Sequence, residues 1–275
     1  MNPTGVEGLD ELARSIRTNI IRMIGEIGYG HVGGSLSIVE ILVCLYHRQM
    51  RLRAGDPKWP DRDRFVLSKG HCGPALYAVL ESKGYLKYED LMTLNKNGTI
   101  LPSHCDMIKT PGVDMSAGSL GMGLSAAVGM ALAAKKDSKD IRVYFVIGDG
   151  ESQEGQIWEA AMAAHKFELD NLIGFVDSNK LQIDGRVSEV IPIEPIKEKW
   201  NAFGWHVQEI DGHDCQQILS ALALAASWKG QPSIIIANTI KGKGVSFFEN
   251  QVACHHVCFE PGQVESALKE LEVAA

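Results

Sequence analysis

Residues 143–155 read VYFVIGDGESQEG, and this stretch decides the fold class. Its five leading apolar residues, 143–147, are typical of a strand that is buried on both faces of a sheet. The run stops at Gly148-Asp149-Gly150, where glycine lets a backbone come close to a ligand. Further strands that end in polar or glycine-rich residues are expected at 64–67, 172–176, 205–210 and 233–237.

Apolar runs that alternate with helices predict a parallel sheet covered on both faces, which is a three-layer α/β fold. We expect a single domain over residues 1–275. Ligands of such folds gather at the carboxyl ends of the strands. Helices are expected at 9–24, from a cap at Ser35 or Ser37 to about Gln49, at 73–83, 88–94, 120–134, 155–166 and 216–226.

Two segments differ from this alternation. Residues 95–117, around His104, read as a long irregular stretch, and a loop of that length in a compact domain is usually functional or mobile. Residues 120–134 are mostly Ala, Gly, Ser and Met, which suits a helix that packs very closely against its neighbour.

The composition is that of a globular protein, with 45% hydrophobic and 22% charged residues and a net charge of −7. No basic tract is present, so nucleic acid is disfavoured as a partner. No run of about 18 apolar residues occurs, so no membrane span is expected. The six cysteines are scattered and the N-terminus has no hydrophobic signal core, from which we expect reduced thiols in a cytoplasmic protein.

Two strand ends supply oxygen ligands. Asp149 offers a carboxylate, and Asn179 offers a neutral amide oxygen at the end of the next buried run. Mg²⁺ prefers such oxygens and often shares them with a diphosphate. The pair therefore predicts a metal that in turn holds a diphosphate.

The segment from Gly148-Asp149-Gly150 to the strand end at Asn179 resembles the thiamine-diphosphate signature. Residues 153–155, QEG, match the version found in transketolases. The resemblance implies thiamine diphosphate and Mg²⁺ or Ca²⁺ as cofactors, with Asp149, Asn179 and Leu181 on the metal. It further implies cofactor contacts from His71, Gly118, Leu120, Gly150, Glu151, Asn179, Lys241 and His255.

Four histidines in polar loops also match transketolase positions. His31 lies in GHVGGS, His71 follows Ser68-Lys69-Gly70, His104 precedes the GSLGMG stretch at 118–123, and His255 follows the KGKG stretch at 241–244. The resemblance implies that these four imidazoles contact substrate or cofactor. Val32, Met122 and His256 depart from the usual family residues, and the choice between His255 and His256 stays open.

The resemblance extends only to the first, diphosphate-binding domain of a transketolase. It implies a partner chain with the pyrimidine-binding and C-terminal domains, in a heterotetramer, with Glu154 and Glu159 at the interface. The expected reaction moves a two-carbon ketol unit from a ketose or ketose phosphate to an aldose or aldose phosphate, as in the pentose phosphate pathway. The chain alone should bind metal and diphosphate but turn over little substrate.

Other interpretations remain open at this point. A deoxyxylulose-phosphate-synthase-like protein and the alpha chain of a 2-oxoacid dehydrogenase share Gly-Asp-Gly and the asparagine, and a non-catalytic cofactor-binding module is a further alternative. Cys254-His255-His256-Val257-Cys258 contains zinc-type ligands in a poor tetrahedral pattern. A plain dinucleotide-binding domain is disfavoured because no Gly-x-Gly-x-x-Gly follows the first strand.

Overall fold

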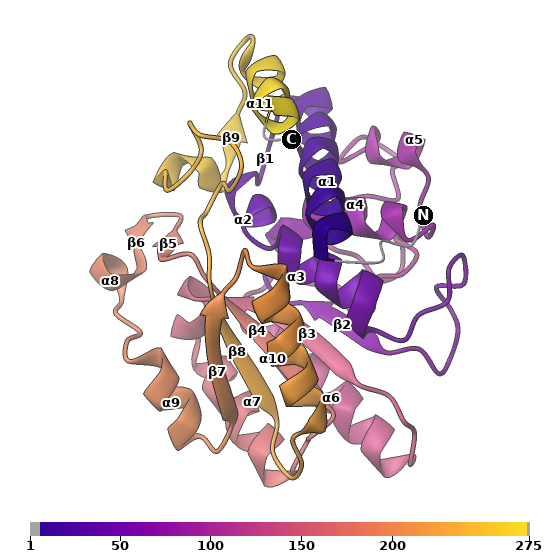
Figure 1. Cartoon of the computed structure of the whole chain (residues 1–275), viewed down its shortest axis with the longest axis vertical. Helices are drawn as coiled ribbons and strands as arrows, with labels where there is room; N and C mark the ends of the chain where they lie inside the picture. Colours follow the sequence, from indigo (N-terminus) through magenta and orange to yellow (C-terminus); the bar gives the residue numbers. More distant parts are fainter. Residues whose placement is uncertain (1–5, 274–275) are drawn as a thin grey trace.

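A central sheet of five parallel strands organises the chain, whose computed structural model describes residues 6–273. The spatial order is β2-β3-β4-β8-β7 (Figure 1). The strands are β2 (Arg64–Leu67), β3 (Val143–Gly148), β4 (Leu172–Ser178), β7 (His206–Asp211) and β8 (Ser233–Asn238). The predicted α/β fold with a parallel sheet is confirmed.

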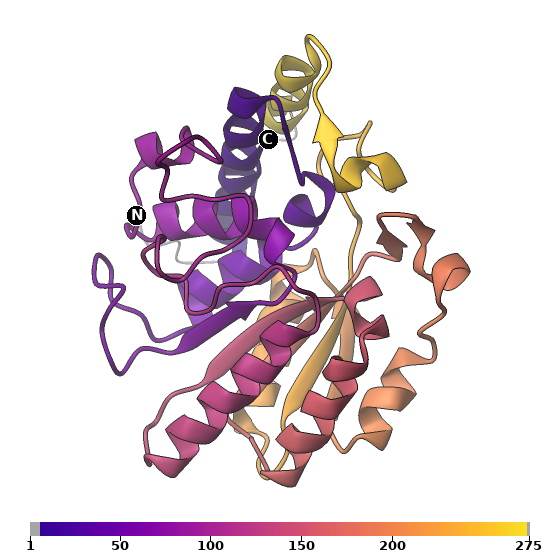
Figure 2. The ribbon, with the colours of Figure 1, turned by 180° about the vertical axis from the view of Figure 1, so that it is seen from behind.

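Helices cover both faces of this sheet, because alternate strand side chains enter two separate cores. Tyr144 and Val146 of β3 pack into one core, and Phe145 and Ile147 pack into the other. On the first face lie α1 (Val6–Ile27), α3 (Val39–Cys44), α4 (Gly73–Ser82) and α10 (Cys215–Ser227). On the second lie α6 (Met122–Lys136), α7 (Gly155–Lys166) and α9 (Ile196–Ala202), and Figure 2 shows α6 and α7 side by side in front of the sheet.

The helix expected from Ser35 or Ser37 to Gln49 is wrong as a single element. The segment forms α2 (Gly33–Leu36), α3 and the π-helical turn η1 (Leu45–Gln49). Neither serine is an N-cap, because Val32 precedes α2 and Ile38 precedes α3, and Ser37 is instead the C-cap of α2. The Ser35 hydroxyl donates to His31 O at 2.7 Å, and the Ser37 hydroxyl donates to Asp177 Oδ2 at 2.7 Å. The Ser35 bond is local, whereas the Ser37 bond ties the segment to the end of β4, which favours a break in the helix.

Smaller elements refine the remaining expectations. The helix expected at 88–94 ends earlier, as α5 (Tyr88–Leu91), and residues 95–117 are irregular as expected. The elements without a sequence prediction are η2 (Gly70–Cys72), η3 (Gly150–Gln153), α8 (Val187–Val190), α9, η4 (Val252–His255), α11 (Gln263–Val273), and the two-stranded pairs β1 (Tyr29–Gly30) with β9 (Val257–Cys258) and β5 (Leu181–Gln182) with β6 (Gly185–Arg186).

The small residues of α6 allow the close packing that the sequence predicted. A methyl group added at Gly123 would lie 2.4 Å from the hydroxyl oxygen of Ser68, immediately after β2. Gly129 of the same helix has no heavy atom within 4 Å of the corresponding point. Close approach therefore depends on Gly123 and not on glycine throughout the helix.

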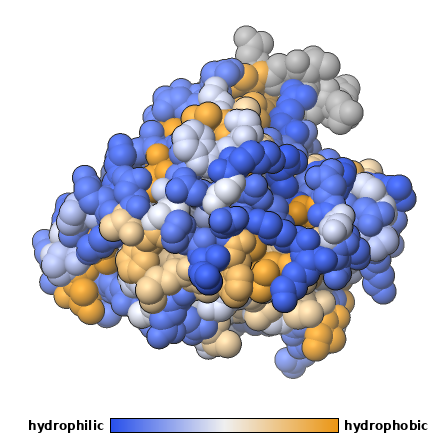
Figure 3. All heavy atoms as spheres, turned by 90° about the horizontal axis from the view of Figure 1, so that it is seen from below, coloured by the Kyte–Doolittle hydropathy of each residue, from blue (hydrophilic) through white to orange (hydrophobic). Residues whose placement is uncertain are grey.

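The surface seen from below is mostly hydrophilic, and its apolar side chains gather in several small groups (Figure 3). None of the helices within residues 6–273 combines the length and the apolar character that a bilayer crossing requires.

Gly123→Ala should lower the free energy of unfolding by about 1–3 kcal/mol, because the new methyl group forces α6 away from Ser68. The matched variant Gly129→Ala should raise it by about 0.5–1 kcal/mol, because alanine replaces glycine at an open helical position. Urea denaturation measures both. Equal effects of the two substitutions would contradict this account of the packing.

Candidate active site

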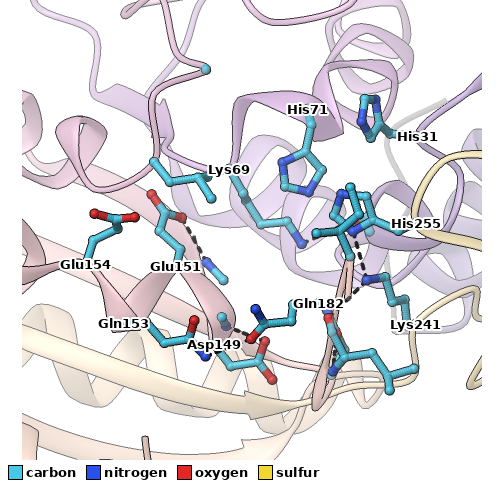
Figure 4. A pocket seen from close by; sticks show the side chains of 18 of the residues that line it. His31, Lys69, His71, Asp149, Glu151, Gln153, Glu154, Gln182, Lys241 and His255 are labelled. Atoms are coloured by element: carbon cyan, nitrogen blue, oxygen red, sulfur yellow. Dashed lines mark hydrogen bonds between the residues drawn. The ribbon is translucent and has the colours of Figure 1, made fainter. Parts of the chain in front are cut away.

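A cavity of about 380 Å³ opens where the strands of the sheet end. Lys69 follows β2, Asp149 follows β3, Asn179 follows β4, and Lys241 lies beyond the end of β8. The strand ends therefore place in one cavity residues that lie far apart in the sequence. Figure 4 shows the labelled histidines on one side and the acidic residues on the other.

Thirteen of the residues singled out in the sequence line this cavity. They are His31, His71, His104, Gly118, Leu120, Asp149, Gly150, Glu151, Glu154, Asn179, Leu181, Lys241 and His255. Glu159 lies outside it, exposed on α7. His256 does not line it either, although its ring centroid is 4.8 Å from that of His31.

The oxygen-bearing side of the cavity is built by the turns after β3 and β4. The Asp149 carboxylate accepts the Gly150 N–H at 2.8 Å and the Lys180 N–H at 2.5 Å. Asn179 donates from Nδ2 to Asp177 Oδ2 at 2.9 Å, and its Oδ1 accepts the Leu181 N–H at 3.1 Å. Each Asp149 oxygen and the Asn179 Oδ1 accepts one backbone N–H here and keeps a further lone pair.

This side of the cavity suits a cation. Burial, together with the nearby Asp177 carboxylate, raises the pKa of Asp149 to about 6, so ionised Asp149 needs more positive charge than Lys69 supplies. A hard divalent ion beside it would supply that charge. Asp149, Asn179 and Leu181 all line the cavity, and carboxylate, amide and carbonyl oxygens are of the kind that Mg²⁺ and Ca²⁺ accept.

Glu151 holds the turn that carries Asp149. Its carboxylate accepts the Gly121 N–H at 2.9 Å, the Gly148 N–H at 3.0 Å and the Ser68 hydroxyl. Burial raises the pKa of Glu151. The side chain thus joins the start of α6 to the end of β3, and its bonds within the protein identify it as a support of the cavity wall.

A buried ion pair lies behind the cavity. The Lys69 ammonium donates to Asp177 Oδ2, and both side chains are almost fully buried. Burial alone would lower the pKa of Lys69, but the Asp177 carboxylate outweighs burial and raises it. Burial alone would likewise raise the pKa of Asp177, and Lys69 lowers it below its ordinary value. Both groups are therefore charged.

Lys241 brings a second positive charge to the cavity. Its ammonium donates to Leu181 O at 2.9 Å and to His255 Nδ1 at 3.0 Å. Burial and the charge of Lys69 lower the pKa of Lys241. Since an ammonium can only donate, Nδ1 of His255 accepts, and the ring hydrogen of His255 sits on Nε2.

The histidines form one cluster around His31. The His31 ring centroid lies 5.3 Å from that of His71, 5.6 Å from His104 and 5.5 Å from His255. Burial first, and then the neighbouring positive groups, lowers the pKa of His31 to about 4 and that of His255 to about 3. His71 and His104 also have pKa values lowered by burial. At neutral pH the cluster is uncharged and can both donate and accept hydrogen bonds.

The sequence did not single out several residues of this site. Lys69 lines the cavity beside its buried partner Asp177. Gln182 also lines it, and its Oε1 accepts from Nε2 of Gln153, a residue of the QEG stretch, at 2.7 Å. Gly34 also lines the cavity, and a methyl group there would lie 3.3 Å from Lys69 Nζ. The positions of Lys69 and Asp177 at strand ends were the available signal.

The zinc alternative gains no ligand set. Within residues 6–273, no three His, Cys, Asp or Glu side chains come together in a group that could hold a metal ion. Cys254 is buried against Gly33, whereas Cys258 is exposed on β9.

Known proteins resemble this chain along almost its whole length. Residues 9–274 match the family described as "Transketolase, thiamine diphosphate binding domain". The chain belongs to this family. The relation supports the thiamine-diphosphate fold and cofactor class that the sequence predicted.

Two relatives of similar length are named as transketolase subunits. The 6-deoxy-6-sulfo-D-fructose transketolase subunit SqwG of Clostridium sp. is 56% identical over 264 residues, which are 96% of each chain. An apulose-4-phosphate transketolase subunit of Phocaeicola vulgatus is 41% identical over 97% of this chain and 94% of its own. The crystal structure of Campylobacter jejuni transketolase superimposes with a TM-score of 0.91 at 34% identity, covering 96% of this chain and 42% of that longer one.

The raised pKa of Asp149 predicts how stability depends on pH. Without metal, the folded state holds a proton on Asp149 up to about pH 6, whereas the unfolded chain releases it near its ordinary pKa of 3.8. The free energy of unfolding should therefore fall as pH rises through this window, by at most about 3 kcal/mol from this group. Urea denaturation in a chelator, from about pH 4.5 to about pH 7, measures the fall.

Asp149→Asn is the control, because it removes this titration and leaves all others. The difference in unfolding free energy between wild type and variant should change with pH across the window. A difference that stays constant would show that Asp149 titrates at its ordinary pKa.

Asp177→Asn should lower the free energy of unfolding by about 3–5 kcal/mol, because it leaves the Lys69 ammonium buried without its partner. Glu194→Gln breaks the exposed Lys180–Glu194 pair, whose nitrogen and oxygen are 3.0 Å apart, and serves as the control. That substitution should cost no more than about 1 kcal/mol. Similar losses in the two variants, measured by denaturation, would refute the special role of the buried pair.

Proposed function

We propose that this chain is the diphosphate-binding subunit of a two-chain transketolase. One observation carries the proposal: Asp149, Asn179 and Leu181 line the same cavity as the His31-centred cluster of uncharged imidazoles. The first set suits a metal diphosphate, and the second suits the hydroxyl groups of a sugar. The chain would act as a single domain, with its partner completing the active site.

The cofactor complex would be thiamine diphosphate with Mg²⁺, or Ca²⁺ in its place. Asp149, Asn179 and the Leu181 carbonyl would hold the metal, and Lys241, His71 and Gly150 would face the diphosphate, together with Gly118, Leu120, Glu151 and His255 on the cavity wall. Thiamine diphosphate supplies the carbon nucleophile and electron sink that carbon–carbon cleavage beside a carbonyl requires. The protein contributes binding, orientation and proton handling.

The histidines would act as uncharged hydrogen-bonding groups. His31 and His104 would orient the donor hydroxyls, because neutral imidazoles both donate and accept. His255 carries its hydrogen on Nε2, since Nδ1 accepts from Lys241, so it would offer a donor to a developing alkoxide. His71 would assist proton movement from its position beside the ring of His255, 5.0 Å away.

A partner chain is proposed on two grounds. Relatives of matching length are named as subunits, and this chain spans only 42% of the Campylobacter jejuni transketolase. Apolar side chains are also exposed beside the cavity: Leu120 is 40% exposed and Ile183 is 60% exposed. A partner with pyrimidine-binding and C-terminal domains would cover them in a cytoplasmic heterotetramer, with Glu154 and Glu159 near the contact.

The substrates would be ketoses with an anionic terminal group. The relative at 56% identity is named for 6-deoxy-6-sulfo-D-fructose, and the relative at 41% for apulose 4-phosphate. Phosphate and sulfonate are both tetrahedral oxyanions. The two donor substrates to compare are therefore a phosphoketose of the pentose phosphate pathway and a sulfoketose. The reaction would move a two-carbon ketol unit to an aldose or aldose phosphate.

Purification of the tagged chain from its native source should bring down a second chain in equal amount. The complex should cleave fructose 6-phosphate or 6-deoxy-6-sulfofructose when thiamine diphosphate, Mg²⁺ and an aldose acceptor are present. Mass spectrometry would identify a product that is two carbons longer than the acceptor. The isolated chain should bind the cofactor but show at least about a hundredfold lower turnover, because in this proposal the partner supplies the groups that activate the pyrimidine ring.

Pyruvate is the control donor. Cleavage of pyruvate but of neither ketose would favour a deoxyxylulose-phosphate-synthase-like or 2-oxoacid-dehydrogenase-like function. Cofactor binding without any turnover by the complex would favour a non-catalytic module. Full activity of the chain alone would refute the two-chain proposal.

A further inference from the structure

A second buried charge network lies beside the cavity without lining it. Glu40 of α3 accepts from Arg17 of α1, with Arg17 Nη1 2.7 Å from Oε1 and Nη2 2.7 Å from Oε2. His213, between β7 and α10, approaches Glu40 Oε2 with its Nδ1 at 3.1 Å. Burial alone would raise the pKa of Glu40, but Arg17 and His213 lower it to about 2. The carboxylate is therefore ionised.

This network fixes the hydrogen position on His213. The backbone N–H of Ile240 donates to His213 Nε2 at 2.8 Å. A peptide N–H can only donate, so Nε2 accepts, and the ring hydrogen sits on Nδ1, where it donates to Glu40. Glu40 thus selects the tautomer whose other nitrogen holds Ile240.

The network forms hydrogen bonds with the backbone on both sides of Lys241. His213 holds Ile240, the residue before Lys241, and Arg17 Nε donates to the carbonyl of Lys243 at 3.0 Å. The intervening Gly242 has φ +84°, and its N–H donates to Gly33 O at 3.0 Å. A side chain at Gly242 would meet the Phe248 carbonyl oxygen at 2.4 Å, so the loop has little freedom to relax.

We propose that Arg17, Glu40 and His213 are positioning residues that hold the Lys241 ammonium in the cavity and thereby set the affinity for the diphosphate group of the cofactor. The proposal rests on the proposed function, in which Lys241 faces that diphosphate. Lys241 is 2% exposed, and its ammonium reaches Leu181 O and His255 Nδ1 from a loop whose neighbouring peptide groups the network holds. A buried lysine has a long flexible side chain, so its placement depends on where its backbone is fixed.

A double-mutant cycle tests whether His213 acts through Lys241. Isothermal titration of the full chain with thiamine diphosphate in Mg²⁺ gives Kd for wild type, His213→Ala, Lys241→Met and the double variant. His213→Ala should raise Kd by about tenfold in the wild-type background, the scale of one hydrogen bond to a charged group. In the Lys241→Met background the same substitution should change Kd by less than about twofold, because the group it positions is gone.

Three controls accompany the cycle. Glu40→Gln should raise Kd, as His213→Ala does. Asp63→Asn alters another buried carboxylate, at the opposite edge of the sheet, which accepts the Arg51 N–H at 2.8 Å and the Arg142 N–H at 2.9 Å. It should lower thermal stability and leave Kd unchanged. If His213→Ala does not fold, His213→Gln, which keeps one donor and one acceptor, takes its place in the cycle with a smaller rise in Kd.

The outcomes separate the two proposals. No binding of thiamine diphosphate by the wild type would overturn the proposed function and this inference with it. Binding by the wild type, with an equal effect of the His213 substitution in both backgrounds or with no effect in either, would overturn the positioning role alone. If Asp63→Asn raised Kd as much as His213→Ala does, the network would affect cofactor binding only through the general stability of the fold.

Discussion

The arrangement of the cavity depends on the hydrogen bonds that the buried Asp177 carboxylate accepts. This carboxylate accepts from Lys69 after β2, from Ser37 after α2, from Asn179 after β4, and from Thr239 after β8. These donors come from four segments that meet only at the carboxyl edge of the sheet. Burying a carboxylate costs free energy unless its lone pairs accept hydrogen bonds. Each of the four segments must therefore lie where its donor reaches Asp177. The same contacts turn the Asn179 amide so that its oxygen is free of Asp177.

Burial has opposite effects on the two sides of the cavity. It raises the pKa of Asp149 and lowers the pKa of His31 and His255, because the charged form of each group is disfavoured. The imidazoles remain uncharged close to two lysines, and the positive charge is thus confined to Lys69 and Lys241. Burial therefore makes the Asp149 carboxylate favour a nearby cation, and it makes the imidazole cluster suited to uncharged hydroxyl groups.

Much of the fold could be predicted from the sequence, because apolar runs such as 143–147 are long and stop abruptly at polar residues. The Gly-Asp-Gly motif and the loop histidines likewise indicated the residues that line the cavity. The break of the helix expected up to Gln49 could not be predicted, because it accompanies a bond from Ser37 to Asp177, a partner that only the folded chain brings near. The positions of Lys69 and Arg17 depend on pairings across more than 20 residues, which periodicity does not encode.

The charges of the cavity favour a ligand that carries both signs. A diphosphate alone would bring negative charge to Lys241 but also to Asp149, whose ionised form burial and Asp177 already disfavour. A divalent cation alone would satisfy Asp149 but would lie near Lys241, whose ammonium shares the Leu181 carbonyl. If the two bound together, Asp149 would hold the cation and Lys241 would face the diphosphate, and the cation and the diphosphate would neutralise each other. Each like-charge contact is then replaced by an opposite-charge contact, so the two components should bind cooperatively.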